Sequence, residues 1–225
     1  MQYQVHSSEL EMDHQVHLLP QNNQLRALHT IIRDRNAARG DFVFYSRRVM
    51  RLLIEESLNL LPFEECEVQT PVGETYPGLK FSSKLCGVPI IRAGESMELE
   101  LRAVCDGIRV GKILIQRDKD TKQPTLYYSN LPADISHRHI LLLDPMLATG
   151  GTACAAIKLL EEKGVREDKI IFVNFIASPQ GLQRVRSEHP NVQIVTSSIE
   201  RTMNEDAFML PGIGDFGDRF FGTVG

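Results

Sequence analysis

The sequence has no excess of basic residues and no long apolar run. Its 25 Lys and Arg residues are outnumbered by 29 Asp and Glu residues, for a net charge of -4. Binding to a nucleic-acid backbone requires a basic excess, so we predict no nucleic-acid partner. No stretch approaches the roughly 18 apolar residues of a membrane span, and MQYQVHSSELEMDHQ has neither an apolar signal core nor an Arg-rich transit face. We therefore expect a cytoplasmic protein without a membrane partner.

Cysteines are few and dispersed. Cys66, Cys86, Cys105 and Cys154 form no C-x-x-C pair and have apolar or small neighbours. This pattern is typical of reduced, buried thiols in an intracellular protein. We expect neither a disulfide nor a zinc site.

The length of the chain suits one core with an appendage. At 225 residues, 42% of them hydrophobic, it can bury one substantial core and lies near the size at which domains divide. The first residues are polar and show no sustained period, so residues 1–19 should be a flexible N-terminal extension in which His6, His14 and His17 are solvated. Residues 20–225 should form a single domain.

Apolar spacing predicts two helices and then an arm. Helical intervals occur in NNQLRALHTIIRD and in FVFYSRRVMRLLIEESLNLL, and Asp41 should be the N-cap of the second helix. Residues 67–70 and 85–92 are predicted to be strands. Between them, TPVGETYPGLKF should form a hairpin or arm.

The remainder of the chain alternates apolar runs with helical patterns. The runs GKILIQR, HILLLDP, KIIFVNFIAS and VQIVTSS suit strands buried on both faces, and GGTACAAIKLLEEKG and PQGLQRVRSEHP have helical spacing. This alternation predicts an α/β fold with a mostly parallel, twisted sheet flanked by helices. Ligands bind beyond the carboxyl ends of such strands, so the residues leaving each strand are the candidates for a site.

The segment ILLLDPMLATGGT places one carboxylate, Asp144, at the end of a buried strand and follows it with a small-residue loop and a helix that starts near Thr152. Backbone N–H groups of such a loop converge on an anion, and the Thr149 and Thr152 hydroxyls can donate hydrogen bonds. Glycine content alone fits an ordinary strand-to-helix turn. An acid followed five residues later by T-G-G-T is a narrower pattern, because the acid can hold sugar hydroxyls while the loop holds the phosphate. A kinase P-loop is excluded because no Lys follows Gly151.

The run DPMLATGGT resembles the motif with which type I phosphoribosyltransferases bind 5-phosphoribosyl 1-pyrophosphate (PRPP). Most of them carry two adjacent acids, and Pro145 replaces the second here, as in the uracil phosphoribosyltransferase branch. The resemblance covers about residues 20–225 and is closest to eukaryotic and protozoal members, with Glu200 and Met209 where Asp and Ile or Val are usual. It implies the type I phosphoribosyltransferase fold and the conversion of uracil and PRPP to UMP and pyrophosphate.

Two further arginines follow predicted strands. Arg92 begins RAGESM, which resembles the pyrophosphate loop of the family, and a guanidinium suits a diphosphate because it donates several directional bonds. Alone, Arg92 is equally well explained as a surface ion pair. Arg117 ends ILIQR, and the resemblance implies that it reaches PRPP. We expect KDTKQPT to be a mobile loop that excludes water, with Lys119, Asp120 and Lys122 as solvated charges.

The C-terminal stretch FMLPGIGDFGDRFFGT is dense in Gly, Asp and Phe, which suits a defined loop with aromatic anchors. Backbone amides and carbonyls at the edge of such a loop can match the alternating donors and acceptors of uracil. The stretch matches the uracil loop of the family in full, which implies a base-binding hood at about residues 200–225. The alternative is a structural C-terminal cap, in which Asp218 and Arg219 pair to hold the loop.

No nucleophile stands beside a base among these motifs, so we expect direct displacement at the anomeric carbon. Magnesium should accompany PRPP, held by PRPP oxygens and water rather than by the protein. By the resemblance, the catalytic residues are Asp144, Arg117 and Asp215. The PRPP-binding residues are Arg92, Ala93, Gly94, Glu95, Arg117, Asp144, Pro145, Met146, Leu147, Ala148, Thr149, Gly150, Gly151, Thr152 and Asp215, and the uracil-binding residues are Met209, Gly214, Asp215 and Phe216.

Two other interpretations stay open at this point. A regulator could keep the fold to sense PRPP or uridine nucleotides and act on RNA or a protein, and the acidic balance and intact uracil loop weigh against it. A degenerate member could bind uracil without catalysis, and the intact phosphate loop and Arg117 weigh against that.

The resemblance also implies a homodimer or homotetramer that GTP activates allosterically. The matching positions are Arg39 and Arg48 near the second helix and Glu74, Thr75, Tyr76 and Pro77 in the arm. Arginines can clamp a triphosphate. The alternative, that Arg39 and Arg48 are solvated charges at helix ends, explains these two arginines at least as well as a GTP site does.

Overall fold

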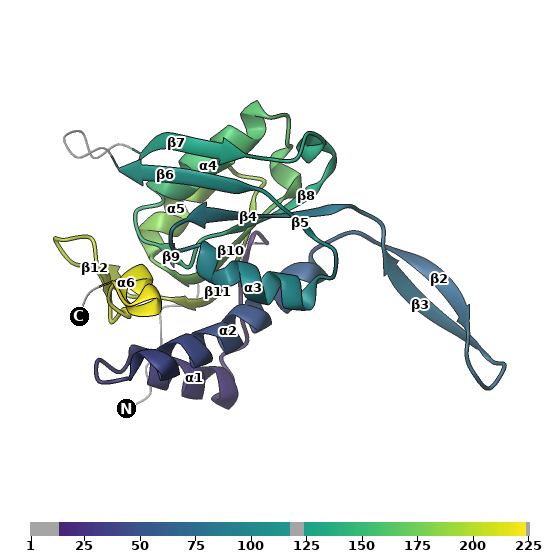
Figure 1. Ribbon diagram of the computed structural model, residues 1–225, viewed down its shortest axis with the longest axis horizontal. Helices are drawn as coiled ribbons and strands as arrows, with labels where there is room; N and C mark the ends of the chain where they lie inside the picture. The colour runs from purple at the N-terminus through teal and green to yellow at the C-terminus, as the bar shows by residue number, and fades with distance from the viewer. Residues whose placement is uncertain (1–13, 118–123, 224–225) are drawn as a thin grey trace.

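The computed structural model describes residues 14–117 and 124–223, which form a sheet layered between helices (Figure 1). The strands are β1 (Val16–Leu18), β2 (Phe63–Gln69), β3 (Thr75–Phe81), β4 (Leu85–Ile91), β5 (Arg109–Val110), β6 (Lys112–Arg117), β7 (Pro124–Asn130), β8 (His139–Leu143), β9 (Met146–Leu147), β10 (Ile170–Ala177), β11 (Gln193–Ile199), β12 (Thr202–Met203) and β13 (Met209–Leu210). The helices are α1 (Asn23–Arg33), α2 (Arg39–Asn59), α3 (Glu95–Val104), α4 (Gly151–Glu162), α5 (Pro179–Glu188) and α6 (Phe216–Phe221), with 3-10 turns at Ile135–His137 and Glu167–Lys169.

The central sheet has the strand order β1-β11-β10-β8-β4-β6-β7. Neighbours along this order pair in parallel, except that β7 runs antiparallel to β6 at one edge. The short strands β5 and β9 join β4 and β10. Because β4, β8 and β10 run in the same direction, the segments that follow them meet at one edge of the sheet.

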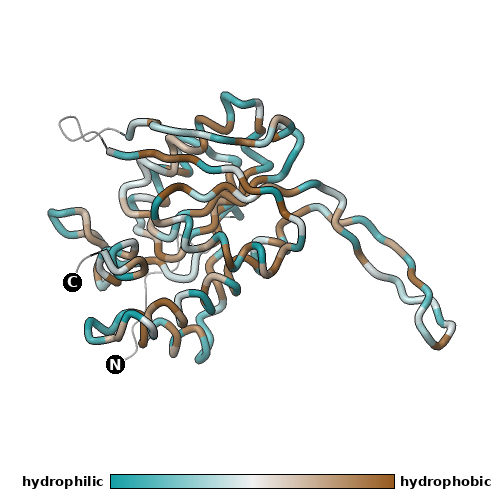
Figure 2. The backbone as a smooth tube through the Cα atoms, viewed as in Figure 1, coloured by the Kyte–Doolittle hydropathy of each residue, from teal (hydrophilic) through white to brown (hydrophobic). Residues whose placement is uncertain are grey.

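Successive side chains of the central strands enter two different cores. In β8, Leu141 and Leu143 belong to the core that includes the buried faces of α1, α2 and α3, whereas Ile140 and Leu142 belong to the core under α4 and α5. This alternation has the two-residue period of a strand. Figure 2 shows the hydrophobic residues concentrated along these strands, so the continuous apolar runs of the sequence mark a sheet covered on both faces.

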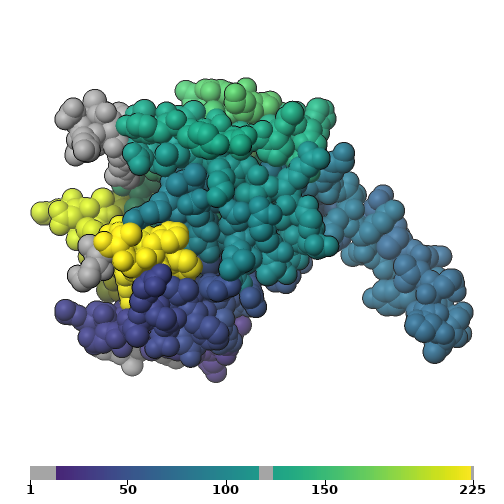
Figure 3. Space-filling view, in the orientation of Figure 1, coloured from purple at the N-terminus to yellow at the C-terminus, as the bar shows by residue number. Residues whose placement is uncertain are grey.

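Strands β2 and β3 form an antiparallel hairpin that stands away from the body of the molecule (Figures 1 and 3). We call residues 63–81 the arm. Phe63 pairs with Phe81 at its base, and Gln69 pairs with Thr75 near its tip. Most arm side chains are exposed on both faces of the ribbon, so the arm contributes almost nothing to the core of its own chain.

The C-terminal residues 200–223, which we call the hood, consist of the β12–β13 hairpin and α6. Figure 3 shows the end of this segment, in yellow, against the α1–α2 region. The Arg219 guanidinium carbon lies 4.1 Å from the centre of the Phe42 ring, and the Phe216 ring is 5.4 Å from the same ring. The hood is therefore attached to the first two helices, far from it in sequence.

The mostly parallel sheet flanked by helices is confirmed, with three local corrections. The extension expected over residues 1–19 is wrong for residues 16–18, because β1 pairs with β11 and half-buried His17 lies 2.7 Å from the Gln193 side chain. Asp41 lies in the first turn of α2 and does not cap it, since Ala38 holds that position. Strand β7 was not expected, whereas the expected hairpin is confirmed and consists of β2 and β3.

Several expectations fall partly or wholly beyond the structure. Residues 1–13 and 118–123, which include most of the expected mobile loop, lie outside the described residues. Within the described part of the chain, no helix combines the length and the hydrophobicity that a membrane crossing requires.

Candidate active site

A cavity of about 570 Å³ lies between the hood and the segments that follow β4 and β8. A small hollow of about 50 Å³, lined by residues 146–153, shares Met146 and Ala148 with it. The cavity therefore brings together the RAGESM turn, the segment that we call the phosphate loop (residues 144–152) and the segment that we call the uracil loop (residues 208–223). Its lining residues are Arg92, Ala93, Met146, Ala148 and residues 207–217.

The phosphate loop, residues 144–152, runs from the end of β8 to the first turn of α4. Gly150 precedes that helix with φ of 77°, a left-handed conformation that glycine adopts without strain. The first N–H groups of a helix have no intrahelical partner, so they are available to an anion in the adjoining hollow. The loop is held from the α5 side, because Ser178 N–H donates to Leu147 O at 2.9 Å and the Ser178 hydroxyl donates to Ala148 O.

Asp144 is nine-tenths buried at the start of this loop. Burial raises the pKa of its carboxyl from 3.8 to about 7, although the Met146 N–H donates to Oδ1 at 3.2 Å and opposes the change. Asn174 donates from its side chain to the Asp144 carbonyl oxygen at 3.2 Å and fixes the backbone there. The carboxyl thus has a fixed position and a costly negative charge, which a donor such as a sugar hydroxyl would stabilise.

The turn after β4 depends on Gly94. A Cβ at this position would lie 2.2 Å from Leu143 O and 2.6 Å from Ile90 N, so only glycine allows the turn to pack onto the ends of β4 and β8. Ala93 lines the cavity. Glu95, expected among the PRPP-binding residues, accepts a hydrogen bond from Lys112 Nζ at 2.7 Å and does not line the cavity.

Arg92 connects this turn to the hood. Its Nη2 donates to Asp218 Oδ1 at 2.8 Å, and its Nη1 donates to Thr223 Oγ1 at 3.0 Å. Hydrogen bonds from Thr223 and Arg92 hold the pKa of Asp218 below its ordinary value. The alternative in which Asp218 pairs with Arg219 is therefore wrong, because Asp218 binds Arg92 and Arg219 donates to backbone carbonyls.

The expected uracil-binding residues all border the cavity in different ways. Met209 is buried in β13, and Gly214 has φ of 75°. Asp215 caps α6 by accepting from Asp218 N–H at 2.8 Å. The Phe216 ring is 1% exposed and lies 5.5 Å from the Phe175 ring, so its side chain packs into the core and its backbone faces the cavity.

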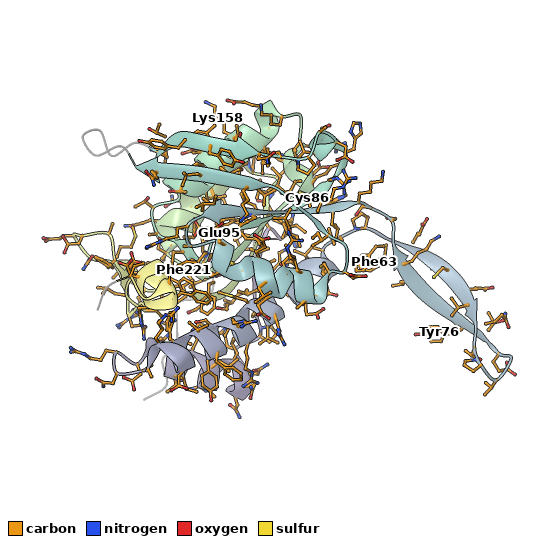
Figure 4. All side chains as sticks on the ribbon, in the orientation of Figure 1. Phe63, Tyr76, Cys86, Glu95, Lys158 and Phe221 are labelled. Carbon is orange, nitrogen blue, oxygen red and sulfur yellow. The ribbon has the colours of Figure 1, made fainter. Side chains whose placement is uncertain are left out.

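The remaining expected site residues are not gathered at the cavity. Arg117 ends β6, and its side chain lies outside what the structure describes. Arg39, whose Nε donates to Phe220 O at 3.0 Å, stands beside the hood. Tyr76 lies on the arm, at the opposite end of the molecule from Phe221 (Figure 4). Within one chain, Arg39 and the arm therefore do not form a common GTP site.

Sequence reasoning missed the residues that support the loops from behind. These are Ser178 and Gly181 behind the phosphate loop and Arg33 and Glu200 behind the uracil loop. A helix-start signal existed for Ser178, which is followed by Pro179 and caps α5. No local signal existed for Arg33, because its partner lies 167 residues away.

Comparison with known proteins gives the family. The sequence-family model for uracil phosphoribosyltransferase matches residues 19–223 of the chain. The chain belongs to the uracil phosphoribosyltransferase family. The uracil phosphoribosyltransferase of Dictyostelium discoideum is 54% identical over 206 residues, which cover 92% of this chain and 95% of that one. The resemblance expected from the sequence is confirmed.

Two solved structures extend the comparison to the fold. The AQ2163 protein of Aquifex aeolicus has a TM-score of 0.80 and 28% identity over 92% of this chain and 97% of that one. The adenine phosphoribosyltransferase of Trypanosoma brucei has a TM-score of 0.51 at 13% identity, covering 85% of this chain and 86% of that one, which is a likeness of fold alone. The type I phosphoribosyltransferase fold is thereby confirmed.

In this member of the uracil phosphoribosyltransferase family, Pro145 follows the single acid of the phosphate loop and has a backbone role. Its carbonyl oxygen accepts from Phe175 N–H at 3.1 Å and Ile176 N–H at 3.0 Å, which ties the loop to β10. The binding roles of the individual site residues stay predictions.

Proposed function

We propose that the chain transfers the phosphoribosyl group of PRPP to uracil, giving UMP and pyrophosphate. The shared cavity carries this proposal. The turn that bears Arg92, the phosphate loop and the uracil loop all line it, and a sugar phosphate that reacts with a flat base needs adjoining sites of this kind. Membership in the uracil phosphoribosyltransferase family supports the choice of base.

The proposed reaction is a displacement at the anomeric carbon. A uracil nitrogen bonds to that carbon while the bond from the carbon to the pyrophosphate oxygen breaks, and the nitrogen releases its proton. We assign the 5-phosphate to residues 148–152, the ribose hydroxyls to Asp144, and pyrophosphate to Arg92 and Arg117. Positioning of this kind can lower a barrier by roughly 7 to 11 kcal/mol without a dedicated acid or base.

Magnesium is proposed to bind together with PRPP. The phosphate loop offers one buried carboxyl, at Asp144, and Pro145 holds the next position, which suits a cation bound mainly by PRPP oxygens and water. Magnesium would neutralise charge on the departing pyrophosphate.

Incubation of the protein with uracil, PRPP and magnesium tests the proposal. We expect UMP and pyrophosphate in equal amounts, and poor use of cytosine and hypoxanthine. Cytosine replaces the 4-carbonyl acceptor with an amino donor, which would leave buried groups of the site unpaired. Uracil binding without turnover, or efficient use of either other base, would contradict the assignment.

We also propose that two copies of the chain associate through the arm. A two-stranded hairpin is marginally stable alone in water, and this one exposes apolar side chains, among them Leu79 at 66% and Tyr76 at 60% exposure. The arm carries Glu65, Glu67 and Glu74, whose charge is opposite to that of the exposed Arg48 on α2 of a second copy. Sedimentation of the wild type and of a Tyr76→Ser/Leu79→Ser variant tests this. The double variant should be monomeric at protein concentrations at which the wild type is still associated.

GTP activation is proposed to act at a site between copies. Arg39 contacts the hood at Phe220, and Phe221 of the hood and Tyr76 of the arm lie at opposite ends of the molecule (Figure 4), which supports a site that combines Arg39 of one copy with the arm of another. Sedimentation and UMP formation, each with and without GTP at saturating magnesium, measure the effect. If GTP changes neither, the allosteric proposal fails and the catalytic proposal stands.

A cytosolic location is part of the proposal. Cys66, Cys86, Cys105 and Cys154 are all free thiols, which suits a reducing compartment. A fluorescent fusion imaged in intact cells tests it.

A further inference from the structure

A buried ion pair lies behind the uracil loop, outside the cavity. Glu200 follows β11 and is 3% exposed. Its Oε1 accepts from Arg33 Nη2 at 2.6 Å and from the Ser198 hydroxyl at 3.0 Å, and its Oε2 accepts from Arg33 Nη1 at 3.0 Å. The pair thus has the parallel two-bond geometry of a guanidinium and a carboxylate, which restricts both orientation and distance.

The same pair holds both backbone groups of Gly212. The Gly212 N–H donates to Glu200 Oε2 at 2.7 Å, and Arg33 Nη1 donates to the Gly212 carbonyl oxygen at 3.0 Å. Gly212 has φ of 68°, and a Cβ there would lie 2.1 Å from Met209 O, so the chain turns tightly at this residue. We call Arg33, Glu200 and Gly212 the clamp.

The clamp acts on the part of the cavity where a base is expected to lie. Gly212 lines the cavity between Met209 and Gly214. On the next residue, the Ile213 carbonyl oxygen accepts from Arg219 Nη1 at 2.8 Å. The backbone of the uracil loop is therefore fixed from behind, which leaves its cavity side free to meet a ligand.

The charges of the clamp balance within it. Burial disfavours the Glu200 carboxylate, but hydrogen bonds from Arg33 and Gly212 outweigh this effect and hold its pKa below the ordinary value. Burial, followed by the charge of Arg33, lowers the pKa of the adjacent His29 to about 4, so His29 is neutral at neutral pH. Arg33 therefore supplies the positive charge next to Glu200.

We propose that Glu200 and Arg33 are positioning residues for base recognition, which set the backbone of Gly212 and Ile213 against the bound uracil. This inference rests on the proposed function. Neither side chain lines the cavity, so their effect would pass through the loop backbone. A displacement of about 1 Å in a positioned group can cost about 100-fold in rate, so a small change in the clamp should be measurable.

Glu200→Gln tests the proposal with almost no change in shape. Its amide has one acceptor oxygen, so in either orientation its NH₂ group faces an N–H donor of Arg33, and it also faces the Gly212 N–H when it replaces Oε2. We expect the KM for uracil to rise by about tenfold or more, with the KM for PRPP changed less than about twofold. Glu200→Asp keeps the charge and should recover part of the uracil KM. Should Glu200→Gln fail to fold, Glu200→Asp carries the same comparison.

Glu167→Gln is the matched control. Glu167 also accepts a backbone N–H, from Asn191 at 3.0 Å, and lies outside the cavity, so both KM values should match the wild type. An unchanged uracil KM in Glu200→Gln, or an equal rise in both KM values, would overturn the positioning role while leaving the proposed function intact.

Amide hydrogen exchange separates the two proposals. In Glu200→Gln, a peptide spanning residues 209–217 should exchange faster than in the wild type, while one spanning residues 146–152 should not change. This comparison needs no turnover. If the wild type forms no UMP, the proposed function fails, and equal exchange in the uracil-loop peptide still overturns the clamp.

Discussion

The buried Asp144 should make the protein less stable when it ionises. Its pKa is raised from 3.8 to about 7 by burial. A tenfold difference in proton affinity is worth about 1.4 kcal/mol, so ionising this carboxyl should cost the folded state about 4 kcal/mol more than the unfolded chain, as an upper estimate. Because the folded-state pKa is the higher one, the stabilisation is complete below about pH 4 and is lost as the pH rises to about 7.

Asp144→Asn removes this pH dependence and keeps the shape. The amide oxygen can still accept from Met146 N–H, so urea denaturation should give similar stabilities for the variant and the wild type near pH 4. At pH 8, the variant should be more stable by up to about 4 kcal/mol. It should also have a lower kcat/KM for PRPP, because it loses the charged acceptor for the ribose hydroxyls. A stability difference that stays constant between pH 4 and pH 8 would refute the reasoning.

Two other substitutions test how α3 and the turn before it are held. Gly94→Ala would place a Cβ 2.2 Å from Leu143 O, so it should abolish UMP formation and lower the Tm. Gly40→Ala is the control, because its Cβ would meet nothing within 4 Å. Wild-type kinetics in Gly94→Ala would contradict the packing argument. The fully buried Glu100 accepts hydrogen bonds from Arg47 and Arg51 of α2. Glu100→Gln should therefore lower the free energy of unfolding by about 1–3 kcal/mol in urea denaturation. A loss within the error of the measurement would refute this.

The sequence predicted the parts of the fold that have a local period. The apolar runs of β8 and β10 predicted buried strands, and the rule that ligands bind beyond parallel strand ends predicted where Asp144 would lie. Strand β1 was missed because backbone hydrogen bonds to β11 form it, while its three residues carry no apolar run. The Arg92–Asp218 pair was missed because it joins residues 126 positions apart, and charge pairs at that separation leave no pattern in the sequence.

The uracil loop itself shows why a complete local motif does not determine a site. The motif fixes where glycines permit tight turns, at Gly212 and Gly214, but a permissive backbone has many conformations of similar energy. One of them is selected by α1, whose last residue, Arg33, binds the Gly212 carbonyl and whose Ile32 carbonyl accepts from Arg219 at 2.7 Å. The part of the cavity to which we assign the base is thus built jointly by the hood and α1. A substitution at the end of α1 should therefore alter the recognition of the base without touching the motif that predicts it.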